Sequence, residues 1–149
     1  MATTKGRIKA ISISEKRGTQ KPNVPEAELK TDFGIVGDAH AANWHRQVSL
    51  LAIESIDKMV AMGAKVSPGN FAENITTEGI ELLKLSVGSK LKVGKDAELE
   101  ITQIGKECHR RCAIFEQVGD CVMPREGIFV KVAEGGVIKV GDIIEVLDD

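Results

Sequence analysis

Short apolar runs separated by glycine fill the second half of the chain, and this pattern constrains the fold more than any other feature. The runs are rich in β-branched residues, and none is longer than eight residues, which suits strands better than helices. They are Leu91–Val93, Ala97–Ile104, Ile128–Val132, Val137–Val140 and Ile143–Val146, with glycines at positions 88, 94, 105, 135, 136 and 141. Many short strands with glycine turns predict a mainly β protein, a closed or partly open β-barrel with one or two short helices.

The first half of the chain carries fewer strand signals. Arg7–Ile13 alternates as a strand, and Arg46–Leu51 is predicted to form another. Between them, Ser14–Pro25 is polar and has no periodicity, which predicts a long mobile loop, either a lid or binding loop or plain disorder. Phe33–Asp38 is a short apolar piece interrupted by glycine.

The clearest helix signal follows the second of these strands. Apolar residues recur there at helical spacing, and a glycine follows them as the predicted C-cap. They are Ile53, Ile56, Met59, Val60 and Met62, followed by Gly63. We expect the methionines to fill the core rather than bind a cofactor. A shorter helix is predicted over Ala113–Val118, and residues 1–149 show no linker, so we expect a single domain.

Charge and cysteine usage narrow the function classes. The net charge of −2 excludes a generally basic nucleic-acid binder, and no apolar run approaches the roughly 18 residues of a membrane helix. The first residues do not read as a signal peptide. Three cysteines, an odd number, argue against a disulfide framework and for reduced thiols. We therefore expect a cytoplasmic protein without membrane or nucleic-acid partners.

The segment Lys106–Cys112 is the sharpest candidate for chemistry. Cys108 has Lys106, His109, Arg110 and Arg111 within three residues, and nearby positive charge favours the reactive thiolate. If a helix begins near Cys108, its dipole lowers the thiol pKa further, and Cys112 lies on the same helical face as a resolving thiol. The alternative is a structural pair of small buried thiols beside solvated charges.

A structural zinc site is the competing interpretation of the same residues. Cys108, His109, Cys112 and Cys121 could supply four ligands. A spacing of three residues between the first two cysteines is not the usual zinc knuckle, and adjacent Cys and His rarely reach one tetrahedral centre. We therefore favour a reactive thiol over zinc.

Three further clusters could bind a polar ligand. The first is Gly37-Asp38-Ala39-His40 with Trp44-His45-Arg46-Gln47. His40 and His45 are five residues apart, which suits neither helical metal spacing nor one face of a strand, so we favour hydrogen bonding over metal ligation. The alternative to ligand binding is that Asp38 only caps a turn of the backbone. The second, Pro68–Ile75, holds Asn70, Phe71, Glu73 and Asn74, which could present amides to a pterin-like heterocycle or cap their own backbone. The third is Arg125, either an anion-binding residue or a surface charge.

Taken together, these segments resemble the MOSC family, the domain at the C-terminal end of molybdenum cofactor sulfurases that also occurs alone. The resemblance runs in colinear order through roughly the middle half of the chain and ends on the cysteine after the Leu99–Ile104 strand. It is carried by Gly37-Asp38, Arg46–Leu51, Pro68–Ile75, Glu78-Gly79, Val87-Gly88 and Leu99–Ile104. The family fold, a mainly β barrel, agrees with the strand pattern.

The resemblance implies sulfur or molybdenum chemistry at Cys108. In one branch this cysteine carries a persulfide received from a cysteine desulfurase that holds pyridoxal phosphate, and passes sulfur to the molybdenum cofactor or a molybdoenzyme. In another branch it ligates molybdenum of a bound pterin cofactor, and the domain reduces N-hydroxylated compounds. A non-enzymatic module that binds or stores the cofactor is the third alternative. The chain has no desulfurase domain, so pyridoxal phosphate is expected only on the partner.

The site residues divide accordingly into two groups. The catalytic group is Cys108, Cys112 and His109, with Cys108 also the metal ligand if the pterin cofactor binds. The cofactor-binding group is Gly37, Asp38, His40, Arg46, Asn70, Phe71, Glu73, Asn74, Arg110, Arg111 and Arg125. The sequence departs from the family at Glu107, where a proline or small residue is usual, and in having Cys112 and Cys121. Assembly into a homo-oligomer stays open.

Overall fold

The computed structural model of the protein describes residues 5–16, 20–105 and 126–147. Its strands and helices follow one another along the chain as β1 (Lys5–Ser12), β2 (Asn23–Val24), β3 (Glu26–Lys30), β4 (Gly34–Ile35), β5 (Val48–Ala52), α1 (Ile53–Ala61), β6 (Ile75–Glu78), the 3-10 helix η1 (Leu82–Lys84), β7 (Lys90–Val93), β8 (Ala97–Ile104), β9 (Ile128–Glu134), β10 (Gly136–Lys139) and β11 (Ile143–Leu147). None of the helices in these ranges is long and apolar enough to span a bilayer.

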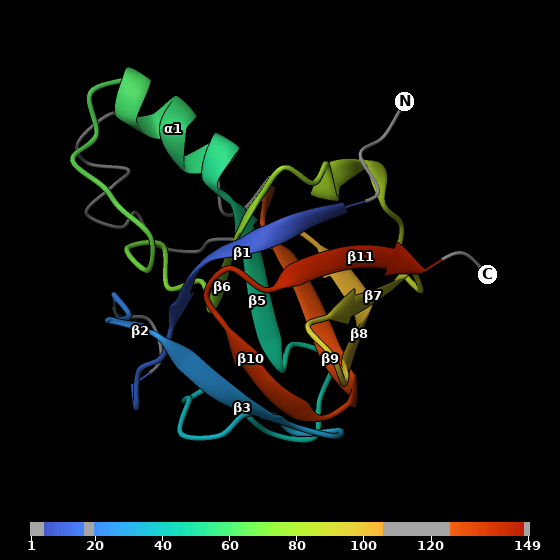
Figure 1. Ribbon diagram of the computed structural model, residues 1–149. Helices are drawn as coiled ribbons and strands as arrows, with labels where there is room; N and C mark the ends of the chain where they lie inside the picture. The colour runs from blue at the N-terminus through green and yellow to red at the C-terminus, as the bar shows by residue number, and fades with distance from the viewer. Residues whose placement is uncertain (1–4, 17–19, 106–125, 148–149) are drawn as a thin grey trace.

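Seven strands close into a barrel (Figure 1). Their order is β1-β11-β7-β8-β9-β5-β6, and β6 pairs with β1 to complete the ring. Neighbouring strands are antiparallel except β5 and β6, which run parallel and are joined by α1. The prediction of a mainly β protein with a closed barrel is confirmed. Closure leaves few unpaired strand edges, which protects such a small protein from edge-to-edge aggregation.

Alternation along the strands fills the barrel interior. In β7, Leu91 and Val93 point inward while Lys90 and Lys92 face solvent, and β8 repeats the pattern. Each fully buried Leu, Ile or Val contributes roughly 1.5–3 kcal/mol to folding. The interior cluster includes Ile8, Ile11, Leu50, Leu91, Leu99, Ile101, Val130 and Ile144.

A second, smaller core lies outside the barrel, between α1 and the outer face of β5 and β9. Leu51 and Phe129 come from these strands, Ile56 and Met59 from α1, and Phe71 from the loop before β6. The expectation that the helix methionines fill the core is right for Met59 and wrong for Met62, which is 50% exposed. Met62 is the C-cap residue, and Gly63 with φ of +101° turns the chain away there, so the apolar stripe ends one turn earlier.

A three-stranded sheet of β10, β3 and β4 packs beside the barrel (Figure 1). The sequence analysis did not predict β3, because Glu, Ala and Lys have low strand propensity. Ala27 and Leu29 nevertheless alternate inward, and pairing with β10 supplies the backbone hydrogen bonds. The same sheet edge leads through β4 into the loop that carries Gly37 and Asp38.

Candidate functional site

A buried ion pair joins two of the segments that the sequence analysis selected. Lys21 and Asp38 are 2.8 Å apart between Nζ and Oδ1, and both side chains are fully buried. The backbone N–H of Lys21 donates to Gly69 O at 2.8 Å, which ties it to the loop before β6. Lys21 therefore connects the Asp38 loop with the Asn70 loop. The prediction of a mobile loop over Ser14–Pro25 is wrong for residues 20–25, which are anchored here and include β2.

Glycine is required at two points of this junction. A Cβ at Gly69 would lie 2.1 Å from Lys21 O, so only glycine lets the two backbones approach. Gly37 has φ of +90° with open space around it, so its requirement is conformational. Both positions were selected from sequence as turn glycines, and the turn at Gly37 is followed by the buried Asp38.

Asp38 is the centre of the hydrogen-bond network. Its Oδ1 accepts from the backbone N–H of Ser14 at 3.1 Å as well as from Lys21, and its Oδ2 accepts from the backbone N–H of His40 at 3.1 Å. Nδ1 of the His40 ring lies 3.5 Å from the same Oδ2. Burial raises the pKa of Asp38, but the hydrogen bonds from His40, Lys21 and the backbone amides outweigh it, so the net pKa lies well below its ordinary value.

We expect the stability that Asp38 contributes to be lost in acid. The carboxylate of the unfolded chain takes up its proton near the ordinary pKa of 3.8, whereas the carboxylate of the folded protein stays ionised to a lower pH. The contribution is therefore complete above about pH 5 and falls by up to about 1.4 kcal/mol per pH unit below about pH 4. Urea denaturation at pH 7, 5 and 3 should show the advantage of wild type over Asp38→Asn shrinking at pH 3. An unchanged difference at pH 3 contradicts this, and Asp57→Asn, an exposed carboxylate of α1, is the matched control.

The loop before β6 satisfies its own backbone. Glu73, fully buried, accepts from the N–H groups of Gly69 at 3.0 Å and Phe71 at 3.2 Å and from Thr76 Oγ1 at 3.1 Å. Burial raises the pKa of Glu73 above its ordinary value despite these donors. Asn70 Oδ1 accepts from the N–H of Ser67 at 3.1 Å, which is the backbone cap that the sequence allowed. Phe71 packs into the core beside α1.

Asn74 bridges the two strands on either side of β6. Its Oδ1 accepts from the backbone N–H of Ser49 at 3.0 Å, and its Nδ2 donates to Ser12 O at 3.1 Å. The side chain is fully buried. Both polar atoms therefore bond to the main chain of β5 and β1, and the predicted cofactor contact of Asn74 stays a prediction.

Arg46 lies on the outer face of the barrel, between two aromatic rings. Its guanidinium carbon is 4.8 Å from the Trp44 ring centroid and 5.6 Å from that of Phe129. Its Nε is buried and has no hydrogen-bond partner among the residues that the structure describes. Cation–π contacts hold such a group in place without consuming its N–H donors. Arg46 is half-buried, and its guanidinium adds a fixed positive charge at this place, which suits an anionic ligand.

The Arg46 region lies beside the strand ends that flank residues 106–125. His45 Nε2 is 3.0 Å from Gln103 Oε1, and the carbonyl of His45 accepts from Thr102 Oγ1. Gly105, the residue after β8, donates its N–H to Gly127 O at 2.6 Å. The ends of β8 and β9 are therefore hydrogen-bonded together next to the loop that carries Arg46.

The catalytic candidates and three of the four candidate arginines lie outside the described residues. These are Cys108, His109, Cys112, Arg110, Arg111 and Arg125, together with Cys121 of the zinc alternative. Within residues 5–16, 20–105 and 126–147, no three His, Cys, Asp or Glu side chains are placed to hold a metal ion. Of the remaining candidates, the structure brings Asp38 and His40 together with the Asn70 loop through Lys21.

Lys21 is the residue of this site that the sequence analysis did not select. It stands in a polar stretch with Lys16 and Arg17, and no local pattern distinguishes a buried lysine from a solvated one. Its role depends on Asp38, which is 17 residues away. The proline that follows it marks a turn but gives no indication of burial.

The protein is a closed β-barrel in which Lys21 joins the Asp38 loop to the loop before β6. Comparison with known protein families identifies the family to which this barrel belongs. The family model of the MOSC domain matches residues 37–145. The chain belongs to the MOSC domain family, whose association with the molybdenum cofactor implies a related function. No curated protein matches the chain.

Solved structures confirm the fold. The YuaD protein from Bacillus subtilis superposes with a TM-score of 0.81 at 19% identity, covering 95% of each chain. YiiM from Escherichia coli gives a TM-score of 0.65 at 18% identity, covering 96% of this chain and 70% of that one. YiiM from Geobacillus stearothermophilus gives 0.64 at 16% identity, covering 99% and 75%. At these identities the likeness concerns the fold.

Proposed function

We propose that the protein carries sulfur for the molybdenum cofactor, with Cys108 as the acceptor of a persulfide sulfur. The observation that carries the proposal is Arg46, a cation held between two aromatic rings, next to the joined ends of β8 and β9. Cys108 follows Gly105 by three residues in the sequence. Positive charge near a cysteine favours its thiolate and stabilises an anionic persulfide. Membership of the MOSC family supplies the molybdenum context.

The first chemical step is thiolate exchange on a donor persulfide. The Cys108 thiolate attacks the terminal sulfur of the persulfide on a cysteine desulfurase, a new S–S bond forms, and the donor cysteine leaves as a thiolate. The desulfurase holds the pyridoxal phosphate and converts free cysteine to alanine. No net oxidation occurs, because one S–S bond replaces another.

The second step releases sulfur in its reduced form. The Cys112 thiol attacks the inner sulfur of the Cys108 persulfide, which forms a Cys108–Cys112 disulfide and expels hydrosulfide. The two thiols supply the two electrons that reduce the transferred sulfur. The molybdenum cofactor, free or in a molybdoenzyme, is the proposed acceptor. Because the carrier must return to the dithiol state, we place the protein in the reducing cytoplasm.

Intact-mass spectrometry tests the sulfur-carrier proposal. Incubation with a cysteine desulfurase and cysteine should add one sulfur to the protein, and Cys108→Ala should abolish the addition. Cys121→Ala is the matched control and should behave as wild type. Arg46→Met should slow the addition, because it removes the fixed cation while keeping an apolar side chain between the rings. Equal sulfur uptake by Cys108→Ala, or none by wild type, contradicts the proposal.

A bound pterin cofactor is the second candidate, and Arg46 favours it as well. The positive charge of Arg46 suits an anionic group of the cofactor, and Asp38, His40 and Asn70 would border the ligand. The cofactor would supply molybdenum redox chemistry, and the chain would bind and orient it. Expression in a host that makes the cofactor, followed by metal analysis, should then give about one molybdenum per chain. Reduction of N-hydroxylated compounds by that material separates a reductase from a storage module.

A further inference from the structure

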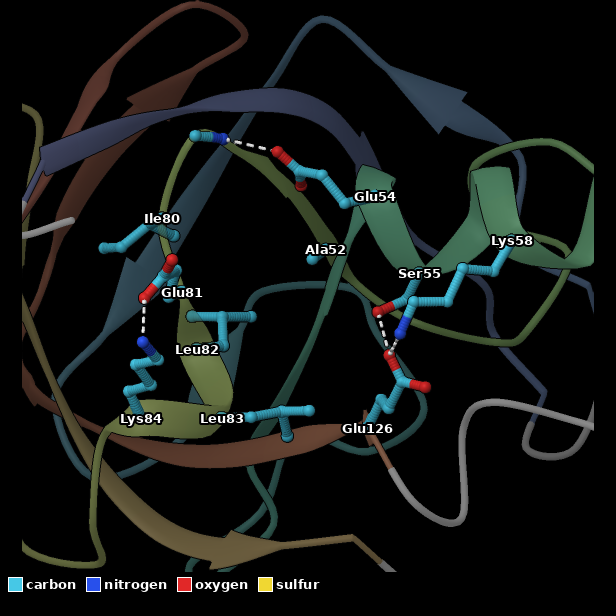
Figure 2. A pocket seen from close by; sticks show the side chains of 11 residues that line it. Ala52, Glu54, Ser55, Lys58, Ile80, Glu81, Leu82, Leu83, Lys84 and Glu126 are labelled. Atoms are coloured by element: carbon cyan, nitrogen blue, oxygen red, sulfur yellow. Dashed lines mark hydrogen bonds and ion pairs between the residues drawn. The ribbon is translucent and has the colours of Figure 1, made fainter. Parts of the chain in front are cut away.

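A pocket opens where the parallel strands β5 and β6 end and α1 begins (Figure 2). Ala52 is the last residue of β5, and Gly79 directly follows β6. Both line a cavity of about 480 Å³, together with the first turns of α1 and the η1 segment. Ligands of α/β proteins bind at the carboxyl ends of parallel strands, beside the helix that connects them. The volume lies within the roughly 300–1,000 Å³ range of small-molecule sites.

The floor of the pocket is apolar and fixed. Ile80 and Leu82 line the pocket together with Ala52, and both are 3% exposed because they belong to the barrel core cluster. Leu83, 49% exposed, stands at the rim and points across the opening in Figure 2. A hydrocarbon or aryl group of a few carbons placed there would cover Leu83 and release ordered water.

Two of the three carboxylates around the pocket are already paired with cations. Glu126, whose side chain is 12% exposed, accepts from Ser55 Oγ at 2.6 Å and Lys58 Nζ at 3.0 Å. Glu81 is 3.2 Å from Lys84 Nζ at the opposite wall. With three carboxylates against two ammonium groups, the wall carries a net charge of −1.

Glu54 carries the unbalanced charge. Its Oε2 accepts from the backbone N–H of Gly79 at 2.9 Å, which fixes the carboxylate over the opening. No cationic side chain among the described residues pairs with Glu54. A carboxylate whose other oxygen accepts from no described residue, beside an apolar lining, is complementary to a cation that carries an apolar group.

We propose that this pocket binds a small amphipathic cation, a primary ammonium ion on a short hydrocarbon or aryl body. The ammonium group donates to the other oxygen of Glu54, and the body lies against Leu82 and Leu83. A carboxylate ligand of the same shape meets the net negative wall and is rejected. The described residues that line the pocket include none of the residues of the sulfur-carrier proposal, so this inference goes beyond that proposal.

Titrations with three probes of one shape test the charge preference. 2-Phenylethylamine, 2-phenylethanol and 3-phenylpropanoate are added to the ¹⁵N-labelled protein, and amide shifts are followed. The amine should saturate with a Kd of about 1 mM, as expected for a ligand of this size, and should shift the amides of Gly79 and Leu82. The alcohol should bind about three- to fivefold more weakly, and the anion should not saturate.

Variants distinguish this site from unspecific binding. Glu54→Gln keeps the hydrogen bond to Gly79 and should weaken the amine to the affinity of the alcohol. Leu83→Ser should weaken both probes, while Glu28→Gln, an exposed carboxylate of β3, should change nothing. Cys108→Ala should bind the amine as wild type does, whatever the persulfide experiment shows. Equal binding of the anion, an unaffected Glu54→Gln, or shifts confined to other faces overturns the proposal.

Discussion

Replacing Lys21 by alanine should lower the free energy of unfolding by about 3–5 kcal/mol. The substitution leaves the fully buried Asp38 carboxylate without its cation, and a buried charge without a partner is costly. It also removes the donor to Ser14 Oγ at 3.0 Å. Because Lys21 ties the Asp38 loop to the Gly69 loop, both candidate loops should exchange amide protons faster in the variant. Urea denaturation and hydrogen exchange measure the two effects.

An exposed ion pair provides the control for Lys21. Lys84→Met removes the partner of Glu81, and both of those side chains are largely solvated, so the loss should stay below about 1 kcal/mol. The double variant Lys21→Met with Asp38→Asn should recover part of the loss, because it removes the unpaired charge. A cost for Lys21→Ala no larger than that of Lys84→Met contradicts the structural role of the pair.

Replacing Asn74 by alanine should lower the free energy of unfolding by about 2–5 kcal/mol, because it leaves two buried backbone groups without their hydrogen-bond partner. The N–H of Ser49 and the carbonyl of Ser12 both lose their side-chain partner, and each unsatisfied buried group costs about 1–3 kcal/mol. The small cavity left behind adds to the loss. Chemical denaturation of the purified variant measures this loss of stability. A low yield of folded protein would also indicate that the variant is destabilised.

Asn70→Ala is the matched control for Asn74→Ala. It distinguishes an effect on the stability of the fold from an effect on ligand binding. Asn70 caps Ser67 in a partly exposed turn, so its loss should cost about 0.5–1.5 kcal/mol. If the loop binds the cofactor, Asn70→Ala should lower ligand retention in a protein that is still folded. Asn74→Asp keeps the acceptor for Ser49 but cannot donate to Ser12, so it should destabilise nearly as much as alanine. A stable Asn74→Ala variant would contradict the bridging role.

Six of the seven barrel strands could be predicted because their signal is local, whereas β6 was not predicted. The run Ala97–Ile104 matches β8, and Ile143–Val146 lies within β11, since alternate apolar residues show which face is buried. The helix was predicted to within one turn at its end. β3 was missed because its two inward residues stand among charged ones, and its strand state depends on pairing with β10 more than a hundred residues later.

The candidate site was predictable only as separate segments. Gly37-Asp38 and Pro68–Ile75 were selected for their turn glycines and polar side chains, but sequence could not state which of these side chains face a ligand. Glu73 and Asn74 proved fully buried and bonded to backbone, whereas Asn70 and His40 remain partly exposed. The residue types are identical in both settings, and only the surrounding chain decides whether water or backbone is their partner.

The sequence by itself determined the mainly β class, the inward faces of the strands and the turn positions, because each depends on residues within a few positions of one another. Only the tertiary structure decided that Lys21 is buried against Asp38, that Asn74 joins β5 to β1, and that Glu54 stands over a pocket. Lys21 and Asp38 lie 17 residues apart in the chain. Asn74 lies 25 residues from its partner in β5 and 62 from its partner in β1, and Glu54 lies 25 residues from its own partner. Folding brings these distant segments together, and because Lys21, Asp38 and Asn74 are buried, desolvation makes their polar pairings obligatory.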